Sequence, residues 1–275
     1  MPPSNKIITV DDEKRIIELY IDGLSAPKIL KELNNKFKTK KTVYDTLQKY
    51  GIKCRDFSDY NKVDHNYFSN IDNPRKAYVL GLMITDGWVN ENKNCIGIQL
   101  QEKDKYIIEM IKKEWNSQEK ILFIDRENLQ RFKNSSNMYR ICAYSRKIVE
   151  DLRKFGVVQR KSLRTILPII DDHYMYDMIR GILDGDGCIF THSNGKNIGI
   201  KFTGSHYLMA QLSMFLYTNN KQKITYSIPI NRNTYSNVEW INPKDVSRIA
   251  RKIYKNKENN YFLTRKYERI KHLIG

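Results

Sequence analysis

One stretch of the chain occurs twice, and it limits the possible folds more than any other feature. The copies span residues 78–88, YVLGLMITDGW, and 178–188, MIRGILDGDGC, and each is an apolar run that ends in an Asp-Gly step. Three pairs of identical residues lie 100 positions apart: Gly81 and Gly181, Asp86 and Asp186, and Gly87 and Gly187. A repeat with so long a period indicates two duplicated half-domains rather than a short solenoid unit.

Each copy is predicted to be a helix that ends at its Asp-Gly step. Asn73 and Pro74 supply a cap and a first-turn proline for a helix over residues 74–85, and the second helix is expected to start after Asp172. Small residues spaced four apart share one face of each helix: Gly81 with Thr85, and Gly181 with Gly185. Such strips let two backbones approach closely, so the helices should pack against each other through Gly81 and Gly181.

Packed in this way, the helices would bring Asp86 and Asp186 together at their C-terminal ends, with Asp184 as a third carboxylate nearby. The helix dipole already disfavours negative charge there, so the cluster should raise its own pKa values or recruit cations. Oxygen ligands without clustered His or Cys favour Mg²⁺, for which Mn²⁺ can substitute. A single Asp-Gly step is usually a turn, but two copies in the same helix-to-strand context favour a metal site.

Residues 79–87 and 179–187 resemble the paired motifs of the LAGLIDADG homing endonucleases. The second copy is the closer match, whereas the first has Ile84 where the motif usually has an acid. The resemblance covers about residues 65–275 and implies a monomeric, site-specific double-strand DNA endonuclease of a mobile genetic element. It implies Asp86 and Asp186 as catalytic metal ligands, joined by the backbone carbonyls of Thr85 and Gly185.

The segments that follow the motifs predict an α+β fold of two pseudo-symmetric α-β-β-α-β-β-α halves. In the first half, strands are expected at residues 88–90, 95–101, 121–124 and 138–144, with helices at 105–115 and 146–155. In the second half, strands are expected at 189–191, 198–203, 224–228 and 238–241, with helices at 207–217 and 243–254. The resemblance implies that the two antiparallel sheets form one saddle that straddles DNA.

Polar residues alternate with apolar ones along the predicted strands. Gln99 and Gln101 share one face of their strand, as Lys201 and Thr203 do in the other half. Amide and basic side chains match the donors and acceptors that bases present in the major groove. The DNA contacts predicted in the two halves are Gln99, Gln101, Arg140, His192, Lys201, Thr203 and Arg232.

Two basic residues are predicted beside the metal site. Lys161 and Lys266 follow the last predicted helix of each half, 75 and 80 residues after the motif aspartate of the same half, and they look like the active-site lysines of the family. An ordinary exposed lysine is an equally good interpretation of either residue. The family often has a polar, water-positioning residue at the corresponding strand end, so the resemblance makes Glu102 a further catalytic candidate. Its counterpart is Gly204, which has no side chain, so the two centres are expected to be unequal.

The chain ahead of the repeat predicts a separate DNA-binding domain. Three amphipathic helices within residues 11–50 resemble a helix-turn-helix of the resolvase type, whose third helix would enter the major groove. The contacts predicted here and in the segment that follows are Lys40, Lys41, Thr42, Tyr44, Lys53 and Arg55. A small helical bundle that binds a protein is the alternative, although the basic residues favour DNA. The predicted domains are the helix-turn-helix at 1–51, a linker at 52–72, and the two halves at 73–170 and 171–275.

The charge of the chain points to a polyanionic partner. The formal net charge is +17, and the 48 lysines and arginines are dispersed along the whole length, which suits a long DNA surface. No stretch approaches a transmembrane span and the first residues lack the apolar core of a secretion signal, so a cytoplasmic, nucleoid-associated protein without a membrane partner is expected. The alternative to a nuclease is a non-cleaving DNA- or RNA-binding protein, such as a transcription regulator or intron maturase, on the same scaffold.

Overall fold

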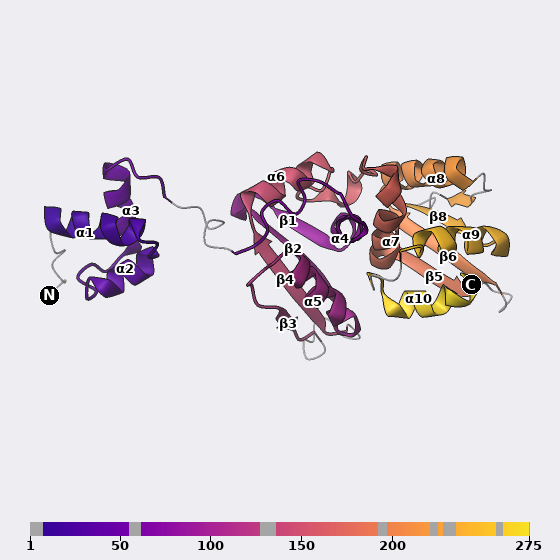
Figure 1. Ribbon diagram of the computed structural model, residues 1–275, viewed down its shortest axis with the longest axis horizontal. Coiled ribbons are helices and arrows are strands. Elements are labelled where there is room, and N and C mark those ends of the chain that lie inside the picture. Colours follow the sequence, from indigo (N-terminus) through magenta and orange to yellow (C-terminus); the bar gives the residue numbers. More distant parts are fainter. Residues whose placement is uncertain are drawn as a thin grey trace. The chain divides into compact units, whose positions relative to one another are not determined.

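A computed structural model describes residues 8–54, 62–126, 136–191, 197–220, 225–227, 235–256 and 261–274. The chain divides into two compact units, Met1–Asp56 and Phe57–Gly275 (Figure 1). No helix among the described residues is long and apolar enough to cross a membrane.

The described part of the first unit has three helices, as predicted: α1 (Val10–Ile21), α2 (Ala26–Glu32) and α3 (Lys40–Lys49). Thr9 starts α1 with a capping box, in which its side chain and that of Asp12 each bond the other residue's backbone N–H. After α1 the chain turns at Gly23, whose φ of +96° is a conformation that favours glycine. The apolar faces of the helices meet in a small core of their own, which contains Ile16, Leu19, Ile29, Val43 and Leu47.

Two helices form the centre of the second unit. Helix α4 (Pro74–Ile84) starts at Asn73, whose side chain accepts hydrogen bonds from two backbone N–H groups of the first turn. Helix α7 (Met175–Asp186) follows a short 3₁₀ turn, and the two helices lie side by side (Figure 1). A Cβ atom added to Gly81 would overlap the Met178 carbonyl and lie 2.8 Å from the Cα of Gly181. The predicted close packing through the two glycines is therefore confirmed.

Each half carries a four-stranded antiparallel sheet, and the two sheets have the same topology. The first, in the order β1-β2-β4-β3, contains β1 (Gly87–Asn90), β2 (Cys95–Gln101), β3 (Leu122–Ile124) and β4 (Met138–Tyr144). The second, in the order β5-β6-β8-β7, contains β5 (Gly187–Thr191), β6 (Ile198–Gly204), β7 (Thr225–Ser227) and β8 (Ser236–Trp240). The remaining predicted helices are present as α5 (Lys105–Glu114), α6 (Arg146–Lys154), α8 (His206–Asn220) and α9 (Pro243–Ile253). The α+β fold with two pseudo-symmetric halves is confirmed.

The structure corrects the predicted linker. Val63, Tyr67, Phe68 and Ile71 are buried in the core of the second unit, so the described part of the segment after residue 61 belongs to that unit. The sequence shows no helical or strand period there, because irregular backbone carries these apolar side chains. A last helix, α10 (Thr264–Ile270), was also not predicted; the first half has only a 3₁₀ turn, Lys161–Leu163, at the corresponding place.

Candidate active site

The two central helices end differently, although their sequences match. Helix α7 continues through Asp186, whereas α4 stops at Ile84 because Thr85 leaves the helical conformation with φ −99° and ψ −85°. A Cβ atom on Gly185 would overlap the Thr85 side chain and lie 3.2 Å from Oδ2 of Asp86. The carboxylate of Asp86 therefore lies against the backbone of the other half, as the predicted convergence requires.

Both motif aspartates hold their protons more tightly than a free aspartate does. Burial, followed by the negative charge of Asp186, raises the pKa of Asp86 to about 6. Asp186 reaches solvent, yet partial desolvation of its carboxylate raises its pKa in the same direction. A bound cation would stabilise the charged form of both groups, and a set of carboxylate and carbonyl oxygens suits Mg²⁺ or Mn²⁺. The two carboxylates therefore fit the predicted ion, while the carbonyl of Thr85, a further predicted ligand beside that of Gly185, also accepts a hydrogen bond from Lys161.

The expected third carboxylate is absent from this cluster. Asp184 is fully buried, and its Oδ2 accepts hydrogen bonds from the Tyr78 hydroxyl at 2.9 Å and the Leu263 N–H at 2.7 Å. Burial raises the pKa of Asp184 to about 6. Asp184 thus points into the core one helical half-turn before Asp186, which points out of it. Among the described residues, no three His, Cys, Asp or Glu side chains group so as to hold a metal ion.

The lysines after each half are buried, so their interpretation as ordinary surface residues is wrong. Lys161 is 7% exposed and Lys266 is 6% exposed. The ammonium group of Lys161 donates to the carbonyls of Thr85 and Gly87. The ammonium group of Lys266 donates to three carbonyls of the second motif at 2.6–2.7 Å, those of Leu183, Asp184 and Gly187. Burial lowers the pKa of both lysines.

Of the two motif aspartates, each lysine interacts more strongly with the one of the other half, although the strongest carboxylate partner of Lys266 is Asp184 of its own half. Asp186 stabilises the charged form of Lys161 more than Asp86 does. Likewise, Lys266 lowers the pKa of Asp86 more than Lys161 does. In the sequence, each lysine follows the motif aspartate of its own half. In the structure, its electrostatic effect is larger on the motif aspartate of the other half. Each ammonium group is thus bonded to the motif backbone of its own half, while its charge acts more on the motif aspartate of the opposite half than on that of its own.

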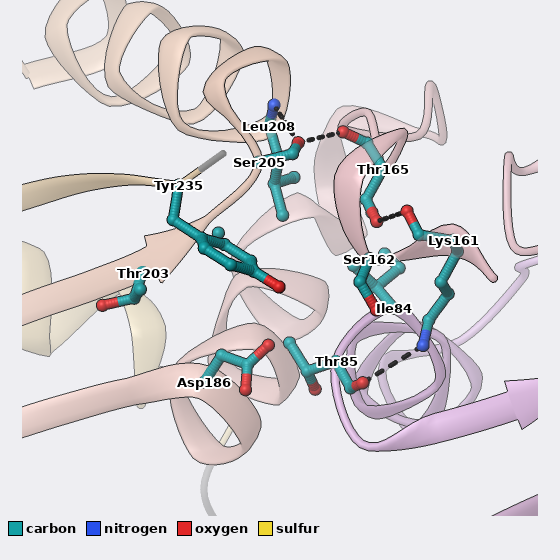
Figure 2. A pocket seen from close by; sticks show the side chains of 11 residues that line it. Ile84, Thr85, Lys161, Ser162, Thr165, Asp186, Thr203, Ser205, Leu208 and Tyr235 are labelled. Atoms are coloured by element: carbon teal, nitrogen blue, oxygen red, sulfur yellow. Dashed lines mark hydrogen bonds between the residues drawn. The ribbon is translucent and has the colours of Figure 1, made fainter. Parts of the chain in front are cut away.

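Two pockets lie beside the paired helix ends. One, of about 520 Å³, is lined by residues of both halves, including Thr85, Lys161, Thr203, Ser205 and Asp186 (Figure 2). The other, of about 410 Å³, is strongly basic and is lined by Lys103, Arg265, Lys266 and Arg269, next to Gly185 and Gly187. The site thus presents two openings, each with one of the two buried lysines.

The counterpart assigned to Glu102 is wrong. In the first hairpin Gly87 pairs with Ile98, and in the second Gly187 pairs with Phe202. Counted from these partners, Glu102 matches His206, which starts α8, and not Gly204. Glu102 is exposed at the start of a 3₁₀ turn and lines neither pocket. The hairpin of the second half has a longer loop, so equal distances along the chain do not mark equal places in the sheets.

Several predicted base readers interact with side chains of the neighbouring strand. Arg140 donates through Nε and Nη2 to Oε1 of Gln99, at 3.0 and 2.7 Å. Thr203 donates to Asn237, and Lys201 lies 3.9 Å from Glu239. Gln101 is half-buried, and its Oε1 has no hydrogen-bond partner among the described residues. The predicted contacts Arg55, His192 and Arg232 lie outside the residues that the structure describes.

Two aromatic residues on the same sheet faces had not been singled out in the sequence. Trp88 lies directly opposite Gly97, and Phe190 directly opposite Gly199. A Cβ atom on either glycine would overlap the aromatic ring. Because cross-strand partners share a face, Trp88 lies on the face of Gln99, and Phe190 on that of Lys201. A glycine within each strand was the available signal, since such a glycine marks a close approach by another group.

In the first unit, the predicted DNA contacts lie at the surface. Lys40, Lys41, Tyr44 and Lys53 are exposed, and Thr42 is half-buried. Two other basic residues of the unit are engaged in ion pairs, Lys36 with Asp12 at 2.6 Å and Lys49 with Glu13 at 2.8 Å. The N-terminal end of α3 therefore presents two adjacent exposed lysines, Lys40 and Lys41.

Comparisons with known proteins find similarity in structure only. No protein-family model matches the chain, and no curated protein sequence does. The LAGLIDADG homing endonuclease I-GzeII in complex with its DNA target is 12% identical with a TM-score of 0.41, over 74% of this chain and 97% of that one. The homing endonuclease I-WcaI bound to its DNA recognition sequence is 13% identical with a TM-score of 0.49, over 74% and 90%. The chain is thus similar to solved LAGLIDADG homing endonucleases, at a level that carries no conclusion about its activity.

Proposed function

We propose that the second unit is a site-specific endonuclease that hydrolyses both strands of DNA with divalent metal ions held at Asp86 and Asp186. One observation carries the proposal: two carboxylates with raised pKa values meet at the ends of packed helices, and a buried lysine of the opposite half acts on each. The net charge of +17 favours nucleic acid as the substrate. On this proposal the chain is a LAGLIDADG homing endonuclease that works as a monomer, because a single chain supplies both centres.

Phosphodiester hydrolysis requires a water in line with the leaving 3′-oxygen and relief of the charge that develops at phosphorus. A bound Mg²⁺ supplies charge relief and makes the attacking water more acidic. Asp86, Asp186 and the carbonyls of Thr85 and Gly185 would hold it. Lys161 and Lys266 keep positive charge beside the opposite carboxylate, where it stabilises negative charge on a scissile phosphate. Since both ammonium groups also bond motif carbonyls, they fix the backbone that carries the ligands.

The test of this function is cleavage of a randomised or host-derived DNA library by the full chain, in Mg²⁺ and separately in Ca²⁺ or EDTA, followed by sequencing of the cut ends. We expect double-strand cuts at one long site in Mg²⁺ and binding without cutting in Ca²⁺. Tight specific binding with no cutting in Mg²⁺ would instead identify a non-cleaving DNA- or RNA-binding protein, such as a transcription regulator or maturase.

We also propose that the first unit binds DNA through the N-terminal end of α3. Replacing both Lys40 and Lys41 by alanine should weaken DNA binding about fivefold and reduce the slope of log affinity against log salt by about two. The matched control replaces Lys36 and Lys49, which are held by Asp12 and Glu13, and should change the slope less. Equal slopes for the two double variants would contradict a DNA-binding role of α3 and favour a protein-binding helical bundle.

A further inference from the structure

Each of the two segments that carry the buried lysines forms hydrogen bonds with residues of the opposite half. The segment after α9 reaches Tyr106, on α5 of the first half. The backbone N–H and side chain of Thr264 donate to the Tyr106 hydroxyl at 2.7 and 3.0 Å, and this hydroxyl donates to the Phe262 carbonyl at 2.7 Å. Lys266 follows Thr264 by two residues, so Tyr106 holds the first turn of α10, which carries the lysine.

An ion pair reinforces this crossing. Nε of Arg265 lies 3.0 Å from Oδ2 of Asp104, whose side chain is only 3% exposed. Asp104 immediately precedes α5, on which Tyr106 stands. A carboxylate buried to this degree requires a partner, because an unpaired buried charge is costly. The residue directly before Lys266 is therefore also held by the first half.

The first half makes the reciprocal crossing. Its lysine-bearing segment meets the start of α8, where the Ser205 hydroxyl donates to the Thr165 carbonyl and the Gln211 side chain accepts from the Leu167 N–H at 2.8 Å. Thr165 in turn donates to the carbonyl of Lys161 at 2.9 Å. Figure 2 shows the continuous path from Ser205 through Thr165 and Lys161 to the carbonyl of Thr85.

We propose that each half positions the active-site lysine of the other: Asp104 and Tyr106 hold the segment of Lys266, while Ser205 and Gln211 hold the segment of Lys161. The inference rests on the proposed function for the role of the lysines. Each centre then consists of the aspartate and the positioning residues of one half and the lysine of the other. Damage to one set of positioning residues should impair one centre and spare the second, so the two DNA strands should be affected unequally.

Two conservative variants with matched controls test this arrangement. Tyr106→Phe removes only the hydroxyl that holds the segment of Lys266. Its control is Tyr67→Phe, which removes a buried hydroxyl that has no partner among the described residues. Ser205→Ala removes the bond to Thr165 together with a helix cap, because Ser205 also accepts from the Leu208 N–H. Its control is Ser145→Ala, which removes the equivalent cap of α6 without touching either lysine segment.

The first readout does not depend on cleavage. The full chain is labelled briefly with acetic anhydride at neutral pH, and mass spectrometry gives the rate at each lysine. Tyr106→Phe should raise the reactivity of Lys266 about fivefold and leave Lys161 unchanged, as expected for one lost hydrogen bond. Ser205→Ala should do the reverse, and neither control should change either lysine. Equal changes at both lysines, or none, would overturn the proposal.

The second readout is strand cleavage on an end-labelled DNA site selected from the library. Tyr106→Phe and Ser205→Ala should each slow one strand about fivefold, and the slowed strand should differ between them. A residue that only stabilises the fold would slow both strands together, and that result would count against positioning. If the wild-type chain cuts no DNA in Mg²⁺, the proposed function fails, whereas the labelling result still decides whether the crossed contacts hold the lysines.

Discussion

The two motifs are similar in sequence, but the surroundings of their C-terminal ends differ. At the second, α7 runs through Asp186, Asp184 is bonded to Tyr78 and Leu263, and Lys266 is anchored to three carbonyls. At the first, α4 stops early, apolar Ile84 stands where Asp184 does, and the ammonium group of the lysine holds two carbonyls.

This difference shows that a duplicated motif need not give duplicate electrostatics. Asp86 lies against the backbone of the other half and is the more buried of the two aspartates, whereas Asp186 reaches solvent. The polar network of Asp184 joins Tyr78 of the first motif helix to Leu263, and the first motif has no equivalent carboxylate because Ile84 stands at that position. The two centres should therefore share one chemistry but respond differently to proton concentration and to loss of their lysine.

The largest effect should come from the aspartates themselves. Asp86→Asn and Asp186→Asn should each lower double-strand cleavage by about a thousandfold or more, because an amide is a poor substitute for a carboxylate as a metal ligand. DNA binding in Ca²⁺ should be largely retained, and the exposed Asp172→Asn is the control. Undiminished cutting of both strands by either variant would show that the metal ligands are wrongly assigned.

At the contact between α4 and α7, substitutions in the two motifs should have similar effects on stability. Gly81→Ala and Gly181→Ala place a Cβ atom against the carbonyl of Met178 or of Tyr78, so each should lower the free energy of unfolding by about 3 kcal/mol. Urea unfolding of the two variants measures this. A difference between them of more than about 1 kcal/mol would show that the packing here is as unequal as the electrostatics.

Replacement of the two lysines should have different effects at the two motif ends. Lys266→Met and Lys161→Met should each slow cleavage about fiftyfold by removing a cation beside the site. Lys266→Met should also destabilise the fold more, since it leaves three buried carbonyls without their donor instead of two. Thermal unfolding and strand cleavage are measured beside Lys103→Met, a control at an exposed lysine of the second pocket. A control as impaired as Lys266→Met would show that only general basicity matters.

The pH dependence should be the mildest difference. With a pKa of about 6, Asp86 is mostly protonated at pH 5, so protons should compete with Mg²⁺ and cleavage should fall about tenfold between pH 7 and pH 5. The strand cut at the centre of Asp86 should be affected first, because Asp86 is the more buried aspartate. Equal decline of both strands, or none above pH 5, would contradict this ordering.

Protonation of Asp86 should reduce cleavage but stabilise the fold. The pKa of Asp86 is raised from about 3.8 to about 6 in the folded state, so the folded chain binds this proton more tightly than the unfolded chain. In EDTA the free energy of unfolding should consequently decrease as pH rises from about 4 through about 6. Asp86→Asn should make this decrease smaller, and Asp184, whose pKa is also raised to about 6, accounts for part of what remains. Chemical unfolding of the wild-type chain and of Asp86→Asn at several pH values measures this difference.

Short-range signals explain how much of the fold was predictable. The cap at Asn73, the strand alternation around Gln99 and the spacing of Gly81 and Thr85 act within a few residues, and the elements that they indicate are present. Residues 63–71 were missed because their apolar side chains follow no period, and α10 because the residues before it gave no cap signal. The counterpart of Glu102 was wrong because unequal loops shifted the register of the second hairpin.

The sequence by itself determined that the chain has two similar halves, that their helices meet through glycines, and that two aspartates stand at the ends of those helices. These properties follow from spacing within one helix or strand. The tertiary structure alone decided that Asp184 turns into the core, that both lysines are buried, and that the charge of each acts more on the motif aspartate of the opposite half than on that of its own. Contacts between residues some 75 to 160 positions apart set these features, because they depend on how whole halves dock, and no local pattern records that.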